Sequence, residues 1–142
     1  KKMNLKIKAR AIILKDNKVL LIKDNRCDKY MLPWWTLENW ETIINTLNRE
    51  IKEELGITPV IDKCLYTREY TTWDNSKWIE FCFLISNIDD FQSIDKSKCT
   101  HWYEWDSVNF YDLNSLESFD VYPKNLKDLI INWLENTKIY LI

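Results

Sequence analysis

Glycine is almost absent from this chain. The 142 residues contain one glycine, Gly56, beside eight tryptophans. Average usage of about 7% would give about ten glycines in a chain of this length. Turns use glycine where the backbone must adopt positive φ, and tryptophan is among the poorest replacements there. Either the chain turns with other residues, or some of its tryptophans stand where glycine belongs.

Length and composition predict a single globular domain over residues 1–142. The sequence is 46% hydrophobic and 30% charged, with a net charge of -2, so no nucleic acid polymer is expected as a partner. The longest apolar runs are far shorter than the roughly 20 residues of a membrane span. The first residues lead directly into strand-like alternation and lack the apolar core of a signal peptide. We therefore expect a cytoplasmic protein without a membrane partner.

The periodicity of apolar residues predicts an α/β fold. Strand patterns occur at residues 5–14, 19–22, 30–32, 58–70, 77–85 and 101–105. The first two should form a hairpin, and the pair before and after Trp73 should form another. Helical periodicity occurs at residues 42–55 and 123–134, with a loop or a short helical turn at 109–121.

The helix predicted at residues 42–55 has two contrasting faces. Its apolar stripe comprises Ile43, Ile44, Leu47, Ile51 and Leu55, and Gly56 follows as a helix-ending residue. The opposite face carries Glu50, Glu53 and Glu54, whose i, i+3 and i+4 spacing brings three carboxylates together. An acidic helix face is commonly no more than a solvated surface. It also supplies the oxygen ligands that hard divalent cations prefer.

Residues 32–57, LPWWTLENWETIINTLNREIKEELGI, resemble the Nudix box, whose signature is G-x5-E-x7-R-E-U-x-E-E-x-G-U with U aliphatic. The opening glycine position is Trp35. The other eight of nine fixed positions agree at the right spacing: Glu41, Arg49, Glu50, Ile51, Glu53, Glu54, Gly56 and Ile57. The resemblance implies a Nudix hydrolase, with a Nudix-type α/β/α sandwich built on a mixed β-sheet.

The resemblance also implies a metal site. Glu50, Glu53 and Glu54 would hold Mg²⁺ or Mn²⁺, to which the backbone carbonyl of Trp35 would add a ligand. Such a cation neutralises the diphosphate of the substrate and lowers the pKa of a bound water. Glu53 or Glu54 would serve as general base through water, and the motif does not decide between them.

Three further residues of the box have supporting roles by the same resemblance. Arg49 would orient the catalytic carboxylates through ion pairs, and its i+4 spacing to Glu53 fits that role. Glu41 would close the loop onto the helix by a salt bridge or a cap. Gly56 would end the helix.

The implied reaction is hydrolysis of a nucleoside diphosphate linked to another moiety, which releases a nucleoside monophosphate and the phosphorylated remainder. The expected partner is a small nucleotide substrate, and the oligomeric state is left open. The alternative is a non-catalytic Nudix-fold module that binds a nucleotide or a protein. A third interpretation is a structural domain whose acidic helix has no catalytic role. This interpretation requires eight positions of the Nudix box to agree by chance.

The tryptophans of the box suggest a translation hypothesis. Replacing Trp34, Trp35 and Trp40 by glycine gives P-G-G-T-L-E-N-G-E, the form that Nudix boxes typically show. Trp73 also lies where a hairpin turn favours glycine. We hypothesise that the gene reads the codon UGA as glycine, an alternative genetic code, and that these residues are mistranslated. A glycine conformation would appear as positive φ at Trp34, Trp35 or Trp40. The competing interpretation is a divergent, tryptophan-rich protein.

Outside the box, the sequence indicates less. Glu80 is interpreted as a surface glutamate rather than one that faces the metal site. His101 is either a distal acid or base or, more commonly for a lone histidine, structural. Tyr66, Tyr70 and Tyr103 either stack on a nucleobase or pack within the sheet.

Overall fold

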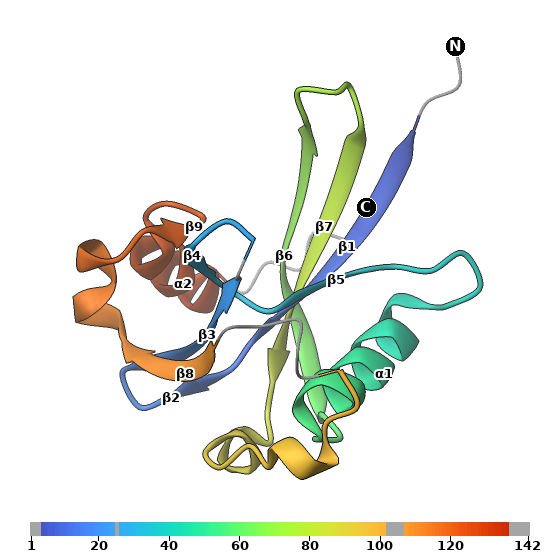
Figure 1. Ribbon diagram of the computed structural model, residues 1–142. Helices are drawn as coiled ribbons and strands as arrows, with labels where there is room; N and C mark the ends of the chain where they lie inside the picture. Colours follow the sequence, from blue (N-terminus) through green and yellow to red (C-terminus); the bar gives the residue numbers. More distant parts are fainter. Residues whose placement is uncertain (1–3, 25, 102–106, 137–142) are drawn as a thin grey trace.

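The computed structural model describes residues 4–24, 26–101 and 107–136. Strands come first, then a helix, more strands and a second helix, as the sequence predicts (Figure 1). The strands are β1 (Leu5–Ile12), β2 (Leu14–Lys15), β3 (Lys18–Asp24), β4 (Lys29–Met31), β5 (Trp34–Thr36), β6 (Ile61–Thr71), β7 (Lys77–Ile85), β8 (Ser107–Asp112) and β9 (Val121–Tyr122). The α-helices are α1 (Ile43–Leu55) and α2 (Leu126–Glu135), and 3-10 helices are η1 (Ile88–Phe91), η2 (Lys96–Lys98) and η4 (Leu113–Ser118).

The strands form two sheets. The first has the order β5-β1-β7-β6, in which β1 runs parallel to β7 and antiparallel to β5. The second has the order β2-β3-β4-β9, and β8 pairs with β3. In this sheet β4 and β9 are parallel, while β3 is antiparallel to its neighbours. Both sheets are therefore mixed.

The predicted hairpin of residues 5–14 with 19–22 is wrong for most of its length. Only Leu14 and Lys15 pair with the returning strand β3, while β1 lies between β5 and β7 in the other sheet. The reason is burial: all four residues from Ala9 to Ile12 are buried, which a central strand covered on both faces satisfies. The chain changes sheets around Ile13, whose carbonyl accepts a hydrogen bond from the Leu20 amide at 3.0 Å.

Helices cover opposite sides of the strands, as Figure 1 shows, which confirms the sandwich architecture. The α1 side of the core joins Leu47, Ile51 and Leu55 to residues of both sheets, such as Phe83 of β7 and Leu20 of β3. The α2 side joins Leu126, Ile130 and Trp133 to a second group of buried residues that includes Ile12, Leu21 and Cys82. The alternate side chains of β7 thus enter two different clusters.

Turns in this chain use asparagine and aspartate in place of glycine. Among the described residues, Asp16, Asp28, Asn75 and Asn125 have positive φ, between 53° and 62°. These are the residue types that tolerate the left-handed region best after glycine. In the confirmed β6–β7 hairpin, Asn75 takes this conformation, and the neighbouring Trp73 is 97% exposed.

Two further predictions concern the C-terminal third. The loop or helical turn predicted at residues 109–121 contains the end of β8 and the 3-10 helix η4. The strand predicted at 101–105 falls mainly on residues 102–106, which lie outside the described residues. No helix in the described part of the chain is both long and apolar enough to span a membrane.

Candidate active site

Helix α1 carries the predicted site and is bounded as the sequence indicates. The Thr42 hydroxyl caps the first turn by accepting a hydrogen bond from the Asn45 amide at 3.2 Å. At the other end, Gly56 has φ of 70° and donates its amide hydrogen to the Lys52 carbonyl at 3.0 Å. The apolar stripe faces the core except for Ile44, which is 40% exposed. Of the three glutamates of α1, Glu50 and Glu53 reach solvent beside this stripe.

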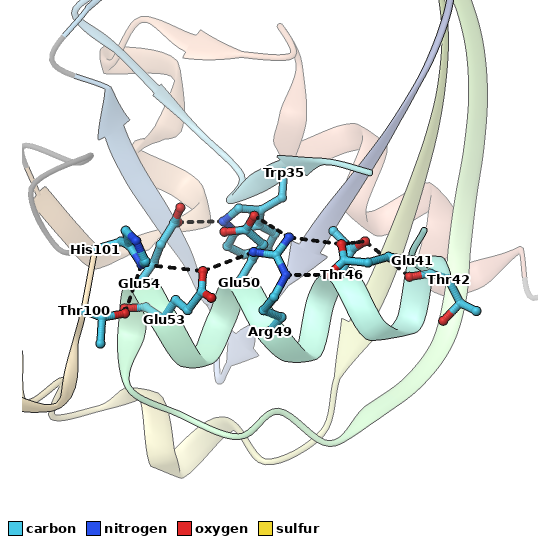
Figure 2. Close-up of polar contacts among 10 residues, drawn as sticks. All are labelled: Trp35, Glu41, Thr42, Thr46, Arg49, Glu50, Glu53, Glu54, Thr100 and His101. Atoms are coloured by element: carbon cyan, nitrogen blue, oxygen red, sulfur yellow. Dashed lines mark hydrogen bonds and ion pairs between the residues drawn. The ribbon is translucent and has the colours of Figure 1, made fainter. Parts of the chain in front are cut away.

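Arg49 lies at the centre of the acidic face (Figure 2). Its guanidinium forms hydrogen bonds with both carboxylate oxygens of Glu41, and the longer of these, from Nη2, measures 3.0 Å. It also pairs with Glu50 Oε1 at 3.0 Å and with Glu53 Oε2 at 3.1 Å. One arginine thus fixes three carboxylates that would otherwise repel one another.

Glu41 anchors the loop before the helix, as predicted. Its side chain is 8% exposed and accepts a hydrogen bond from the Thr46 hydroxyl at 2.9 Å. The hydrogen bonds from Arg49 lower the pKa of Glu41, against the opposing effect of burial. Glu41 is therefore held ionised, and its charge in turn raises the pKa of Arg49.

Glu54 is buried, which differs from the expected solvent-reaching position. Its carboxylate accepts a hydrogen bond at 2.6 Å from the indole Nε1 of Trp35, and the two residues are 2% and 4% exposed (Figure 2). The side chains of Glu50 and Glu53 do reach solvent, at 18% and 31% exposure. The difference arises because Glu54 follows Leu47 by seven residues and so lies on the core-facing side of α1, where the Trp35 indole contacts it.

The donor set of this face suits a hard divalent cation. Glu50, Glu53 and Glu54 offer carboxylate oxygens from one helix face, the ligand chemistry that Mg²⁺ and Mn²⁺ prefer. Within the described ranges, however, no group of three histidine, cysteine, aspartate or glutamate side chains is arranged as a metal site. Here Glu53 pairs with Arg49, and Glu54 bonds to Trp35.

The sequence matches the NUDIX domain family over residues 5–126, which is most of the chain. The chain belongs to this family. Glu41, Arg49, Glu50, Glu53, Glu54 and Gly56 all lie within the matched range.

Solved Nudix structures share the fold at low sequence identity. A NUDIX hydrolase from Nitrosomonas europaea is 20% identical with a TM-score of 0.73, covering 99% of this chain and 94% of that one. An ADP-ribose pyrophosphatase from Streptococcus suis is 18% identical with a TM-score of 0.61, covering 96% and 94%. The NUDIX domain of Shewanella oneidensis NrtR, complexed with ADP ribose, is 18% identical with a TM-score of 0.65, covering 95% and 88%. No curated protein matches the sequence.

The tryptophans of the Nudix box do not adopt a glycine conformation. Trp34 and Trp35 form the extended strand β5, and neither they nor Trp40 are among the residues with positive φ. Trp40 is 81% exposed and Trp73 is 97% exposed, so these two indoles make little contact with the protein. Only Trp35 of this group is buried, and it is the one that contacts a box carboxylate.

His101 lies beside the box, which sequence reasoning raised only as one of two alternatives. Its Nδ1 is 3.5 Å from Glu53 Oε2, and its amide donates to the Glu53 carbonyl at 3.0 Å. The Thr100 amide donates to the same carbonyl at 2.7 Å. No signal in the sequence places Thr100 here, because 47 residues separate it from Glu53.

Glu80 is not the surface glutamate that alternation suggested. It is 2% exposed and pairs with Arg10 at 2.9 Å and with Arg68 at 3.5 Å. The interpretation failed because both faces of β7 are covered, so that Glu80 also lies in the interior.

Two of the three tyrosines considered as nucleobase platforms pack on tryptophans. The ring centroids of Tyr66 and Trp133 are 4.6 Å apart, and those of Tyr70 and Trp78, which lie parallel, are 6.4 Å apart. Tyr103 lies outside the described residues.

Proposed function

We propose that this Nudix protein hydrolyses the phosphoanhydride bond of a nucleoside diphosphate linked to another moiety, and releases a nucleoside monophosphate. The observation that carries the proposal is the ion-pair network in which Arg49 holds Glu50 and Glu53 of α1 together with Glu41 of the preceding loop. A helix that served only as a scaffold would gain little from concentrating like charges in this way.

The residues divide into two roles. Glu50, Glu53 and Glu54, with the backbone carbonyl of residue 35, would hold Mg²⁺ or Mn²⁺. When bound, the cation would neutralise the diphosphate and acidify a water ligand. Glu53 or Glu54 would take the proton from the attacking water, while Arg49 keeps the carboxylates oriented.

We propose that residues 34, 35, 40 and 73 are glycines encoded by UGA. Support comes from the spacing of the box, from the exposure of Trp40 and Trp73, and from the contact of Trp35 with a predicted metal ligand. Without the indole at position 35, the Glu54 carboxylate would lose that hydrogen bond. Sequencing codons 34, 35 and 40 tests the proposal. UGA is the expected result, and UGG at all three positions would refute it.

A non-catalytic binding module is the second candidate, and one observation favours it. If Trp35 is genuine, its indole hydrogen bond occupies Glu54, the carboxylate at the last acidic position of the box. Such a protein would retain the Nudix fold and a nucleotide-binding surface without turnover.

Hydrolysis assays on two forms of the protein separate these candidates. One form is the protein with the 142-residue sequence as given. The other, the glycine form, has glycine at positions 34, 35, 40 and 73. Each would be incubated with a panel of nucleoside diphosphate derivatives, with Mg²⁺ or with EDTA. ADP-ribose is a suitable first compound because two structural relatives act on it or bind it. We expect the glycine form to release nucleoside monophosphate only with the metal. Nucleotide binding without turnover by the glycine form would support the binding module.

A further inference from the structure

A cluster of charged side chains lies on the face of the β5-β1-β7-β6 sheet opposite α1. We call Lys8, Arg10, Arg68 and Glu80 the cation cluster. Lys8 and Arg68 are both in register with Glu80, from the strands on either side of it. Lys8 and Arg10 alternate along β1 with Ala9, which packs into the core on the α1 side.

The cation cluster has more positive than negative charge. Glu80 is the single carboxylate that faces three cations, so two positive charges are left over within the cluster. Arg10 is held in place, since it is 2% exposed, pairs with Glu80 and donates to the Leu32 carbonyl at 3.1 Å. Arg10 is therefore closed to a ligand, whereas the Arg68 side chain is 28% exposed and Lys8 is half-buried.

Aromatic rings surround these two cations. The Lys8 ammonium is 4.8 Å from the Trp78 ring centroid and 4.1 Å from that of Trp34. The Arg68 guanidinium lies 4.9 Å from the Tyr70 centroid and donates to the Tyr122 hydroxyl at 3.1 Å. The Trp78 and Tyr70 contacts do not depend on which residue stands at position 34.

Both cations have unused capacity to bind an anion. No carboxylate forms an ion pair with Lys8 among the described residues, and the ion pair between Arg68 and Glu80 is long, at 3.5 Å against 2.9 Å for Arg10. Burial, together with the charge of Arg10, lowers the pKa of Lys8 to about 8. A bound anion would relieve this repulsion and would keep Lys8 protonated.

Strand β5 connects the cation cluster to the acidic helix. It is the edge strand of its sheet, and successive side chains of a strand point to opposite faces. Trp35 accordingly contacts Glu54 of α1, and the adjacent Trp34 contacts Lys8. The acidic helix and the cation cluster therefore lie on either side of the same edge strand.

We propose that the cation cluster binds a second anionic group of the substrate, a phosphate ester separate from the diphosphate that is cleaved. This inference rests on the proposed function and names its substrate class: a nucleoside diphosphate derivative with an additional phosphate, on the nucleoside ribose or on the linked moiety. Lys8 and Arg68 would donate charged hydrogen bonds to that phosphate.

Binding of matched probes in EDTA tests the inference without requiring hydrolysis. Calorimetry would compare adenosine 5′-monophosphate with adenosine 2′,5′- and 3′,5′-bisphosphate, which place the phosphate on the nucleoside. It would also compare ADP-ribose with ADP-ribose phosphorylated on the distal ribose, which places it on the linked moiety. The affinities would be measured for the protein with tryptophan at positions 34, 35, 40 and 73 and for the glycine form. We expect one phosphorylated probe to bind about tenfold tighter than its partner.

Variants identify the residues responsible. Lys8→Gln and Arg68→Gln should each abolish the preference, and Arg68→Lys should retain part of it. Lys8→Gln should also fold normally, because burial already disfavours the Lys8 charge. The control Lys77→Gln removes the same charge from an exposed pair with Glu69 on the same sheet, and should keep the preference.

Three results would overturn the inference: equal affinities within every pair, no binding of any probe, or a preference that survives in both Lys8→Gln and Arg68→Gln. A preference that Lys8→Gln abolishes supports the inference even in a protein that hydrolyses nothing. Loss of hydrolysis would count against the proposed function, whereas loss of the binding preference would count against the phosphate site. The two failures are therefore distinguishable.

Discussion

Glu80→Gln is expected to destabilise the fold strongly, although Glu80 lies outside the Nudix box. Glu80 and Arg10 are both 2% exposed, and their charged atoms are 2.9 Å apart. Removal of one partner from a buried ion pair typically costs about 3–5 kcal/mol, because the other charge stays buried. With an unfolding entropy of about 2 cal/mol/K per residue, 142 residues give ~0.3 kcal/mol/K. Thermal unfolding should therefore show Tm lowered by about 10–17 °C.

The matched control is Glu69→Gln on the neighbouring strand. Glu69 pairs with Lys77 at 3.0 Å, but these side chains are 62% and 44% exposed. An exposed pair contributes at most about 1 kcal/mol, so Tm should fall by no more than about 3 °C. If Glu80→Gln lowers Tm no further than Glu69→Gln does, the reasoning about the buried pair is refuted.

Two other predictions concern the ends of the box. Gly56→Ala should reduce the free energy of unfolding in urea by about 1–3 kcal/mol, because φ is 70° and a Cβ would lie 2.8 Å from Lys98 Cβ; unchanged stability would contradict this. Hydrogen bonds from Arg49 lower the pKa of Glu41 below its ordinary value of 4.5. Ionised Glu41 therefore stabilises the folded protein fully above pH 4.5. This stabilisation is lost as the pH falls through the lower pKa of Glu41 in the folded state. Glu41→Gln should therefore be less stable than the unaltered protein in urea at about pH 7, and the difference should narrow in strong acid; equal differences at both pH values would argue against the interaction.

Local signals made helix α1 predictable. The boundaries of α1 follow from residues within the segment itself, with Thr42 as the N-cap and Gly56 in the left-handed conformation after the last turn. The β6–β7 hairpin was predictable for a similar reason, because the turn-forming residues 72–76 separate two strand-like segments. Helical spacing also sufficed to place Glu50 and Glu53 next to Arg49.

Contacts between distant segments were not predictable from these patterns. The parallel pairing of β1 with β7 joins Leu5 to Lys77, and apolar runs do not encode which strands pair. The burial of Glu80 depends on α2 and the second sheet, which cover one face of β7. The alternation of polar and apolar residues along β7 predicts that this face is exposed. The Trp35–Glu54 contact depends on how β5 packs against α1. Each of these contacts is set by tertiary packing rather than by local periodicity.

The most direct test of the central claim is the hydrolysis rate of Glu53→Gln and Glu54→Gln in the glycine form. The assay would use the panel compound that this form turns over fastest, at saturating Mg²⁺, with Glu69→Gln as the control for the same substitution at an exposed site. Loss of a charged metal ligand that stabilises the transition state by about 3 kcal/mol should lower kcat roughly a hundredfold or more. The account predicts that loss for both α1 variants and an unchanged kcat for the control. Undiminished turnover by Glu53→Gln and Glu54→Gln would contradict it.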